Sequence, residues 1–425
     1  MRIPSILFLL LISFADPVSA ATPADTSTVA HFFRYQHEGK FEQALELTAL
    51  IFREKATPAL LQQIWQQTEQ TFGAYRGILS MTSSVQNSMT SITAVVGYTQ
   101  AKLTWQVVFD VDGHIQGFFL IKQEPIVTNG EELTIVVPDG HLKGTLQYPE
   151  GRADKSLVAL IIAGSGPTDR NGNSPLGVWA NTYQLLADSL ASHGIASFRY
   201  DKRGIGGSNN FTKLSDVTFE QFVQDAVACI RHLTVMEGFA KCVVIGHSEG
   251  ALIGLLATKQ ADAAAYVSLA GMARPFGDII KDQLIARLNP DAESIAVFAR
   301  QLDSLRQNQE VQSPAKEIEF LFAPGTRHFA ATLMQYHPVK ELRGIRVPTL
   351  IVHGTRDLQI PVKDAHALAD ACPAAHLVII DDVNHVLKAV PNSEQDNVAS
   401  YGDPSLPLSS TLVSTVVSFI KALLR

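Results

Sequence analysis

Six short runs of apolar, mostly β-branched residues alternate with amphipathic stretches in the second part of the chain. The runs cover residues 157–163, 195–200, 243–247, 266–270, 349–353 and 377–381. Each run is too apolar to be half-exposed, which is typical of parallel strands buried between layers of helices. From residue 131 to residue 425, the sequence therefore predicts an α/β domain with a mostly parallel sheet and helices on both faces.

The segment between residues 271 and 347 interrupts this alternation. Ile295, Phe298, Leu302 and Leu305 repeat at helical spacing, and the segment has no good strand pattern. A loop of this size within a compact domain needs structure of its own, and it is usually a lid over a site. We therefore predict a helical cap over about residues 271–347.

The sequence Gly-His-Ser-Glu-Gly at residues 246–250 joins one of the predicted strands to a predicted helix. In this context, Gly-x-Ser-x-Gly forms a sharp, strained turn that exposes the serine hydroxyl and leaves no room for side chains at the flanking glycines. Ser248 is therefore a candidate nucleophile. Taken alone, the pattern also fits an ordinary strand-to-helix turn, so the evidence must come from partners elsewhere in the chain.

Asp357 and His385 are the candidate partners. Asp357 follows the predicted strand at residues 349–353, and His385 follows the one at residues 377–381. The carboxyl ends of parallel strands share one edge of a sheet, where open α/β sheets bind ligands. We therefore predict that His385 takes the proton of Ser248 and that Asp357 orients His385. His247 is disfavoured as the base, because its position next to Ser248 in the turn is geometrically poor.

The chain order of these three residues resembles that of the α/β-hydrolase fold. A closer resemblance, to secreted or periplasmic serine esterases with a small extra domain in front, is carried by residues 163–173 (AGSGPTDRNGN), residues 200–204 (YDKRG) and the turn at residues 246–250. The resemblance implies a serine hydrolase that cleaves small-molecule carboxylic esters through an acyl-enzyme. Such an enzyme requires no cofactor and no metal.

Two backbone N–H groups are predicted to form the oxyanion hole. One belongs to Glu249, the residue after the nucleophile, and the other comes from the loop after residues 157–163, where we choose Ser165. Gly164 and Gly166 on either side of Ser165 let the backbone approach a substrate closely. The side chain of Glu249 has two possible roles, pairing with a nearby Arg or Lys such as Arg170 or Arg203 and contact with the substrate. We favour the pairing, because buried charges are generally paired.

Residues 21–125 have a different pattern. Helical spacing over residues 41–52, and the N-cap Thr57 followed by Pro58, indicate three helices before residue 79. Alternating residues 103–109, a turn at Asp112-Gly113 and residues 115–122 indicate an antiparallel sheet. We predict a small α+β domain with a structural or partner-binding role, because it has no cluster of catalytic residue types.

The first twenty residues have the pattern of a secretory signal, with Arg2, an apolar run at residues 6–14 and small residues at Val18 and Ala20. The apolar run is too short for a spanning helix, which needs about twenty residues. We therefore expect cleavage after residue 20 and an exported protein, periplasmic or secreted, without a membrane span.

The charge balance argues against nucleic acid as a partner. Lys and Arg number 34 against 41 Asp and Glu, a net charge of −7, and no basic run is present. Cys229, Cys242 and Cys372 allow one intramolecular disulfide at most. Cys229 and Cys242 are candidates for it, but buried thiols are favoured.

Two alternatives to an esterase stay open. One is a peptidase, lactonase or thioesterase on the same triad, and the other is a non-catalytic ligand-binding or envelope interaction protein.

Overall fold

The computed structural model describes residues 26–73, 75–86, 89–98, 101–125, 130–149, 155–174, 176–208, 211, 217–390 and 393–424. The expected signal segment, residues 1–20, lies outside them. The chain divides into two compact units, Met1–Ile126 and Val127–Arg425. None of the described helices combines the length and apolar character that crossing a bilayer requires.

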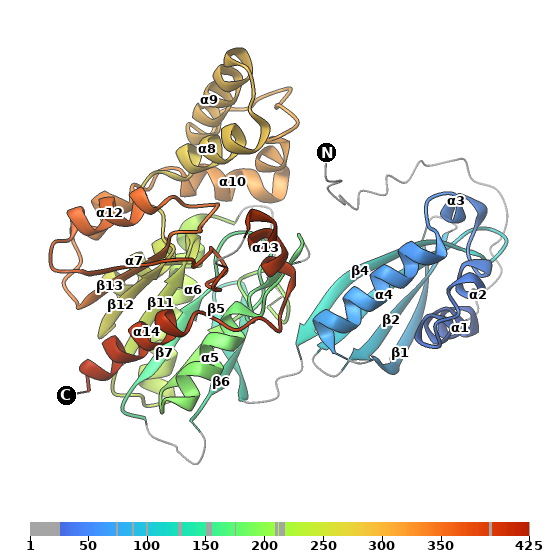
Figure 1. Ribbon diagram of the computed structural model, residues 1–425, viewed down its shortest axis with the longest axis horizontal. Coiled ribbons are helices and arrows are strands. Elements are labelled where there is room, and N and C mark those ends of the chain that lie inside the picture. The colour runs from blue at the N-terminus through green and yellow to red at the C-terminus, as the bar shows by residue number, and fades with distance from the viewer. Residues whose placement is uncertain are drawn as a thin grey trace. The chain divides into compact units, whose positions relative to one another are not determined.

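The first unit packs helices against an antiparallel sheet with the strand order β1-β2-β3-β4 (Figure 1). Its elements are α1 (Thr26–His37), α2 (Phe41–Glu46), α3 (Leu50–Arg53), α4 (Pro58–Phe72), β1 (Tyr75–Gln86), β2 (Met89–Tyr98), β3 (Ala101–Phe109) and β4 (Ile115–Pro125). Phe33 of α1 lies edge-on to Trp105 of β3 and Phe118 of β4, whose own rings stack 4.2 Å apart. Aromatic packing thus joins the first helix to the sheet.

Two short helices, α2 and α3, replace the single helix expected over residues 41–52. Ala49 donates its N–H to the Ile115 carbonyl, and Ile115 donates its N–H to the Leu47 carbonyl. Backbone groups that bind the start of β4 cannot also continue a helix, so the described part of this unit has four helices instead of three. The predicted start of α4 is correct, since Thr57 Oγ1 accepts the Leu60 N–H at 3.2 Å.

The second unit is built on an eight-stranded sheet with the order β14-β13-β12-β11-β7-β10-β6-β5. Its strands are β5 (Glu131–Val137), β6 (Gly140–Gln147), β7 (Val158–Ile162), β10 (Ala196–Tyr200), β11 (Cys242–His247), β12 (Ala265–Leu269), β13 (Thr349–Gly354) and β14 (His376–Ile380). The strands from β10 to β14 in this order are parallel, while β5 and β6 pair antiparallel at the other edge. A separate two-stranded ribbon consists of β8 (Asn173–Ser174) and β9 (Val178–Trp179).

Helices cover both faces of this sheet (Figure 1). Val158, Leu160 and Ile162 of β7 share one apolar core with α6 (Phe219–Arg231), α7 (Glu249–Gln260) and α12 (Val362–Ala371). The alternate residues Ala159 and Ile161 share the opposite core with α5 (Thr182–Ser192) and α14 (Ser410–Ala422). The two-sided burial explains why the strand runs are apolar throughout. The thiols of Cys229 and Cys242 are free and buried.

The insertion between β12 and β13 is helical. It consists of α8 (Phe276–Leu288), α9 (Ala292–Arg306), a 3-10 turn (Glu319–Phe322), α10 (Pro324–Leu333) and α11 (Pro338–Leu342). Phe298, Leu302 and Leu305 of α9 form a local core with Leu321 and Met334. Figure 1 shows α8, α9 and α10 gathered beyond one end of the strands of the sheet. The predicted fold class, an α/β sheet with a helical cap after a small α+β unit, is confirmed.

Candidate active site

Ser248 lies in a sharp turn between β11 and α7. Its φ is 56°, an uncommon value for a residue other than glycine. A Cβ atom at Gly246 would lie 2.2 Å from the Gly250 carbonyl oxygen, and one at Gly250 would lie 2.4 Å from the carbonyl oxygens of Ile162 and Ala163. The turn therefore requires glycine at both positions, as the sequence predicts.

Asp357 and His385 meet at the carboxyl ends of β13 and β14. His385 Nδ1 lies 2.7 Å from Asp357 Oδ2, while Asp357 Oδ1 accepts the N–H groups of Gln359 and Ile360 at 2.8 and 2.9 Å. Burial acts to raise the pKa of Asp357, but the charge of His385 and its hydrogen bond bring that pKa below its ordinary value. The ionised carboxylate accepts the Nδ1 proton, which leaves Nε2 of His385 as the basic nitrogen.

Ser248 follows β11 at the same edge of the sheet as these two residues, although among the described residues no hydrogen bond joins its hydroxyl to His385. The link runs through its neighbour, because His247 Nε2 lies 2.8 Å from the His385 backbone carbonyl. Catalytic hydrogen bonds are often long in proteins without substrate and tighten when substrate binds. The three candidate residues thus gather at one edge of the sheet.

Both ring nitrogens of His247 are occupied. Nε2 donates to the His385 carbonyl, and Nδ1 lies 2.8 Å from the Tyr183 hydroxyl. Burial, followed by the nearby charge of His385, lowers the pKa of His247 to about 3. The ring is therefore neutral, and neither nitrogen is available to take a proton from Ser248.

Ser165 and Glu249, the predicted oxyanion-hole residues, line the same pocket as Ser248. Ser165 lies in the loop after β7, and Glu249 is the first residue of α7. An N–H group in the first turn of a helix has no partner within that helix. Within the described residues, no protein acceptor binds the N–H of Ser165 or of Glu249, so both groups are free to bind a ligand oxygen.

The side chain of Glu249 pairs with a buried cation, as expected, but this cation is Lys202 and neither of the two named examples, Arg170 and Arg203. Lys202 Nζ lies 3.6 Å from Glu249 Oε1, and both residues are buried. The two arginines bind other buried carboxylates, Asp201 and Asp225. The sequence does not reveal which of these cations faces Glu249, because Arg170 lies in the loop after β7, Lys202 and Arg203 lie in the loop after β10, and tertiary packing sets the direction of each side chain.

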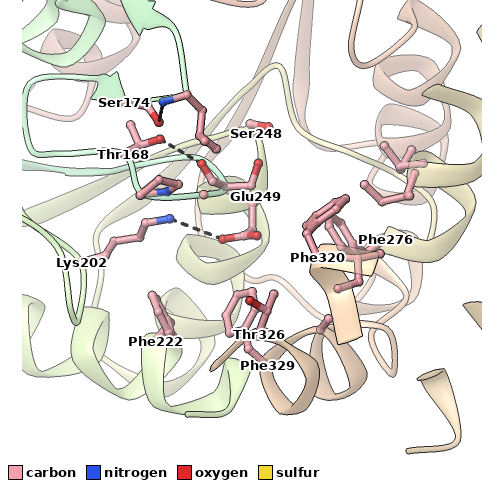
Figure 2. A pocket seen from close by; sticks show the side chains of 18 of the residues that line it. Thr168, Ser174, Lys202, Phe222, Ser248, Glu249, Phe276, Phe320, Thr326 and Phe329 are labelled. Atoms are coloured by element: carbon pink, nitrogen blue, oxygen red, sulfur yellow. Dashed lines mark hydrogen bonds and ion pairs between the residues drawn. The ribbon is translucent and has the colours of Figure 1, made fainter. Parts of the chain in front are cut away.

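The pocket has a volume of about 740 Å³ and two chemically different ends. Ser165, Lys202, Ser248 and Glu249 form the polar end. Apolar side chains of the cap, including Phe276 and Phe320, lie across the pocket from Ser248 and Glu249, whereas Phe222 of α6 lies beneath Lys202 (Figure 2). This arrangement suits a ligand with a reactive polar group at Ser248 and an apolar group beneath the cap. Within the described part of the chain, no three His, Cys, Asp or Glu side chains are grouped to hold a metal ion.

Sequence reasoning did not assign two residues of the site. Lys202 lies two residues after the end of β10, the neighbour of β7, so its position at the carboxyl edge of the sheet was available as a signal. Tyr183 lies in α5, and its hydroxyl accepts the Gly164 N–H at 2.8 Å. An isolated tyrosine in an amphipathic helix carries no comparable sequence signal.

Comparisons with known proteins give one family for each unit. The family described as "Serine aminopeptidase, S33" matches residues 176–388, and a family of unknown function, DUF3887, matches residues 29–118.

Individual proteins are also similar to this chain. Esterase EstD of Thermotoga maritima is 22% identical over 372 residues, which cover 84% of this chain and 86% of that protein. Epoxide hydrolase 3 of Xenopus tropicalis is 27% identical over 198 residues, which cover 39% of this chain and 52% of that protein. Among solved structures, Est1E from Butyrivibrio proteoclasticus aligns with a TM-score of 0.46 and 16% identity, covering 70% of this chain and 99% of that chain.

The first of these matches covers half of the chain and includes Ser248, Asp357 and His385. The matched residues run from α5 to β14 and include the helical cap. The chain belongs to the serine aminopeptidase S33 family of the α/β-hydrolase superfamily.

Proposed function

We propose that this protein is a serine hydrolase that cleaves carboxylic esters with Ser248, His385 and Asp357. The observation that carries the proposal is the 2.7 Å hydrogen bond between His385 Nδ1 and Asp357 Oδ2, beside the strained turn that presents Ser248 to the pocket. Similarity to esterase EstD over most of both chains supports an ester as the substrate.

In the proposed reaction, Ser248 Oγ attacks the ester carbonyl carbon while His385 Nε2 takes the hydroxyl proton. Asp357 keeps the proton of His385 on Nδ1 and stabilises the imidazolium that forms. The carbonyl oxygen becomes an anion, which the N–H groups of Ser165 and Glu249 bind. Collapse of the tetrahedral intermediate breaks the bond to the alcohol, which leaves with the proton from His385. Water then hydrolyses the acyl-serine ester with His385 again as the base.

The proposal is tested with p-nitrophenyl esters from acetate to laurate and with a fluorophosphonate label. We expect a burst of p-nitrophenol, and we expect both turnover and labelling to disappear in Ser248→Ala. Ser414→Ala, at an exposed position in α14, is the matched control and retains both. Turnover that persists in Ser248→Ala would exclude Ser248 as the nucleophile.

Peptide hydrolysis is the second candidate function, because the matching family is described as a serine aminopeptidase. The same triad cleaves amides, with an amine as the leaving group. Labelling of Ser248 without ester turnover, together with release of p-nitroaniline from aminoacyl p-nitroanilides, would favour this function. Absence of labelling would instead favour a non-catalytic binding protein.

We also propose that the protein is exported after removal of residues 1–20, on the basis of the signal pattern alone. The mass of the intact protein recovered from an exporting host tests this, with Ala21 expected as the first residue. A mass that includes the first twenty residues would contradict the proposal.

A further inference from the structure

Gly164, which precedes the predicted oxyanion-hole residue Ser165, is held at both of its backbone polar groups. Its N–H donates to the Tyr183 hydroxyl at 2.8 Å, and its carbonyl oxygen accepts a hydrogen bond from Lys202 Nζ. Tyr183 and Lys202 are only 3% and 2% exposed. Two buried side chains from different elements, α5 and the loop after β10, therefore fix the orientation of this one residue.

The bond from Lys202 also determines where the Ser165 N–H points. The Gly164 carbonyl and the Ser165 N–H belong to the same peptide unit, and in a trans peptide they point in opposite directions. An ammonium group that holds the carbonyl on one side therefore directs the N–H to the other side. It also polarises the peptide, because hydrogen bonds in a chain strengthen one another.

Glu249 supplies the charge that balances Lys202. Burial lowers the pKa of Lys202 and raises the pKa of Glu249, and in each case the opposite charge of the partner opposes this effect. The ion pair spans 3.6 Å at the polar end of the pocket (Figure 2). Because the N–H of Glu249 is the second predicted oxyanion donor, this ion pair connects the two halves of the oxyanion hole.

We propose that Lys202 is a positioning residue for the oxyanion hole: by holding the Gly164 carbonyl, it aims and polarises the Ser165 N–H. This inference rests on the proposed acyl transfer at Ser248. It assigns Lys202 an effect on the tetrahedral intermediate, in which the oxygen is an anion, and little effect on the bound ester, in which that oxygen is neutral.

Three variants separate this role from that of an ordinary buried ion pair. Lys202→Met removes the ammonium but leaves Glu249 without its partner, which destabilises the fold. Glu249→Gln removes the carboxylate and keeps the backbone N–H. The double variant Lys202→Met/Glu249→Gln leaves no unpaired charge, so its stability should recover while the Gly164 carbonyl still lacks the ammonium. Lys259→Met on α7, which removes a partly exposed pair with Glu341, is the control for the substitution itself.

The variants are compared by kcat and KM on a p-nitrophenyl ester and by inhibition with a trifluoromethyl ketone, which forms a tetrahedral adduct with the serine. Loss of a whole oxyanion donor typically costs a hundredfold to a thousandfold in kcat. Because Lys202 only strengthens and aims a donor, we expect the double variant to lose about tenfold to a hundredfold in kcat, with KM changed less than about threefold. The trifluoromethyl ketone should lose affinity by a similar factor, and the matching methyl ketone, which forms no stable adduct, should not.

Recovery of wild-type kcat in the double variant would overturn the inference, since it would leave Lys202 and Glu249 as a structural pair. An equal loss of affinity for both ketones would also overturn it. If the single variants do not fold, the double variant alone decides between these outcomes. A wild-type protein with neither ester turnover nor fluorophosphonate labelling would instead contradict the proposed function.

Discussion

The Nε2–H of His247 donates a hydrogen bond to the backbone carbonyl of His385 across 2.8 Å. On the other side of the ring, Nδ1 accepts the proton of the Tyr183 hydroxyl, whose oxygen accepts the Gly164 N–H. One neutral, buried side chain thus connects the loop after β14 with α5 and the loop after β7. The neighbour of the candidate nucleophile therefore holds the backbone of the candidate base.

His247→Leu should weaken both the fold and the proposed reaction. The substitution removes the acceptor of the Tyr183 hydroxyl proton and the donor to the His385 carbonyl, and each unsatisfied buried donor or acceptor costs about 1–3 kcal/mol. We expect a drop of at least that size in the free energy of unfolding in urea, and a lower kcat because His385 loses its anchor. His366→Leu, at an exposed position in α12, should change stability by less than about 0.5 kcal/mol. Unchanged stability and kcat in His247→Leu would contradict the linking role.

The carboxylate of Asp357 should make stability depend on pH in a defined direction. The folded protein holds its pKa below the ordinary value of 3.8. A carboxyl group of this kind contributes its full stability above its unfolded pKa and loses it as the pH falls through the folded pKa. The difference in free energy of unfolding between the wild type and Asp357→Asn should therefore be largest near neutral pH and shrink below about pH 4.

The matched control for this pH series is Asp382→Asn, in which the side chain is 47% exposed and the carboxylate lies 3.4 Å from Arg356. A surface pair of this type contributes at most about 1 kcal/mol. The two variants should therefore differ most at neutral pH. A difference for Asp357→Asn that stays constant down to pH 2 would contradict the depressed pKa.

The sequence was most informative where chain order and strand ends determine position. Ser248, Asp357 and His385 each follow a strand of one parallel sheet, so periodicity alone placed them at a common edge. The partner of Glu249 was not predictable, because the choice among Arg170, Lys202 and Arg203 depends on directions set by tertiary packing. The break between α2 and α3 has the same origin, since the segment between them pairs with Ile115, distant in the sequence.

Gly250→Ala should disrupt the turn that carries Ser248. The added methyl group would lie 2.4 Å from two backbone carbonyl oxygens, which cannot move without shifting β7. Overpacking in a core typically costs about 1–3 kcal/mol, and contact with rigid backbone places this variant at or above that range. Urea unfolding measures the loss, and ester turnover should fall with it as Ser248 is displaced.

Gly325→Ala in α10 is the matched control, because among the described residues no heavy atom lies within 4 Å of the added Cβ. Alanine within a helix is more favourable than glycine by about 0.5–1 kcal/mol, so this variant should be equally or more stable than the wild type. Equal stability of the two alanine variants would show that Gly250 is not sterically required.

Phe320→Ala tests whether the cap end of the pocket holds the acyl chain. Phe320 lines the pocket but is 57% exposed, so its removal should change stability little. Covering an exposed apolar side chain with a bound acyl chain contributes about 1.5 kcal/mol, which corresponds to roughly tenfold in binding. We therefore expect KM for p-nitrophenyl laurate to rise about tenfold, whereas KM for the acetate, which reaches only the polar end, stays within about twofold. The p-nitrophenol group is common to both esters, so a selective effect on laurate assigns the apolar end to the acyl chain.

The control is Val235→Ala. Val235 is 74% exposed and lies outside the pocket lining, so this variant should change neither KM value. An equal change for both esters would place the alcohol group under the cap instead.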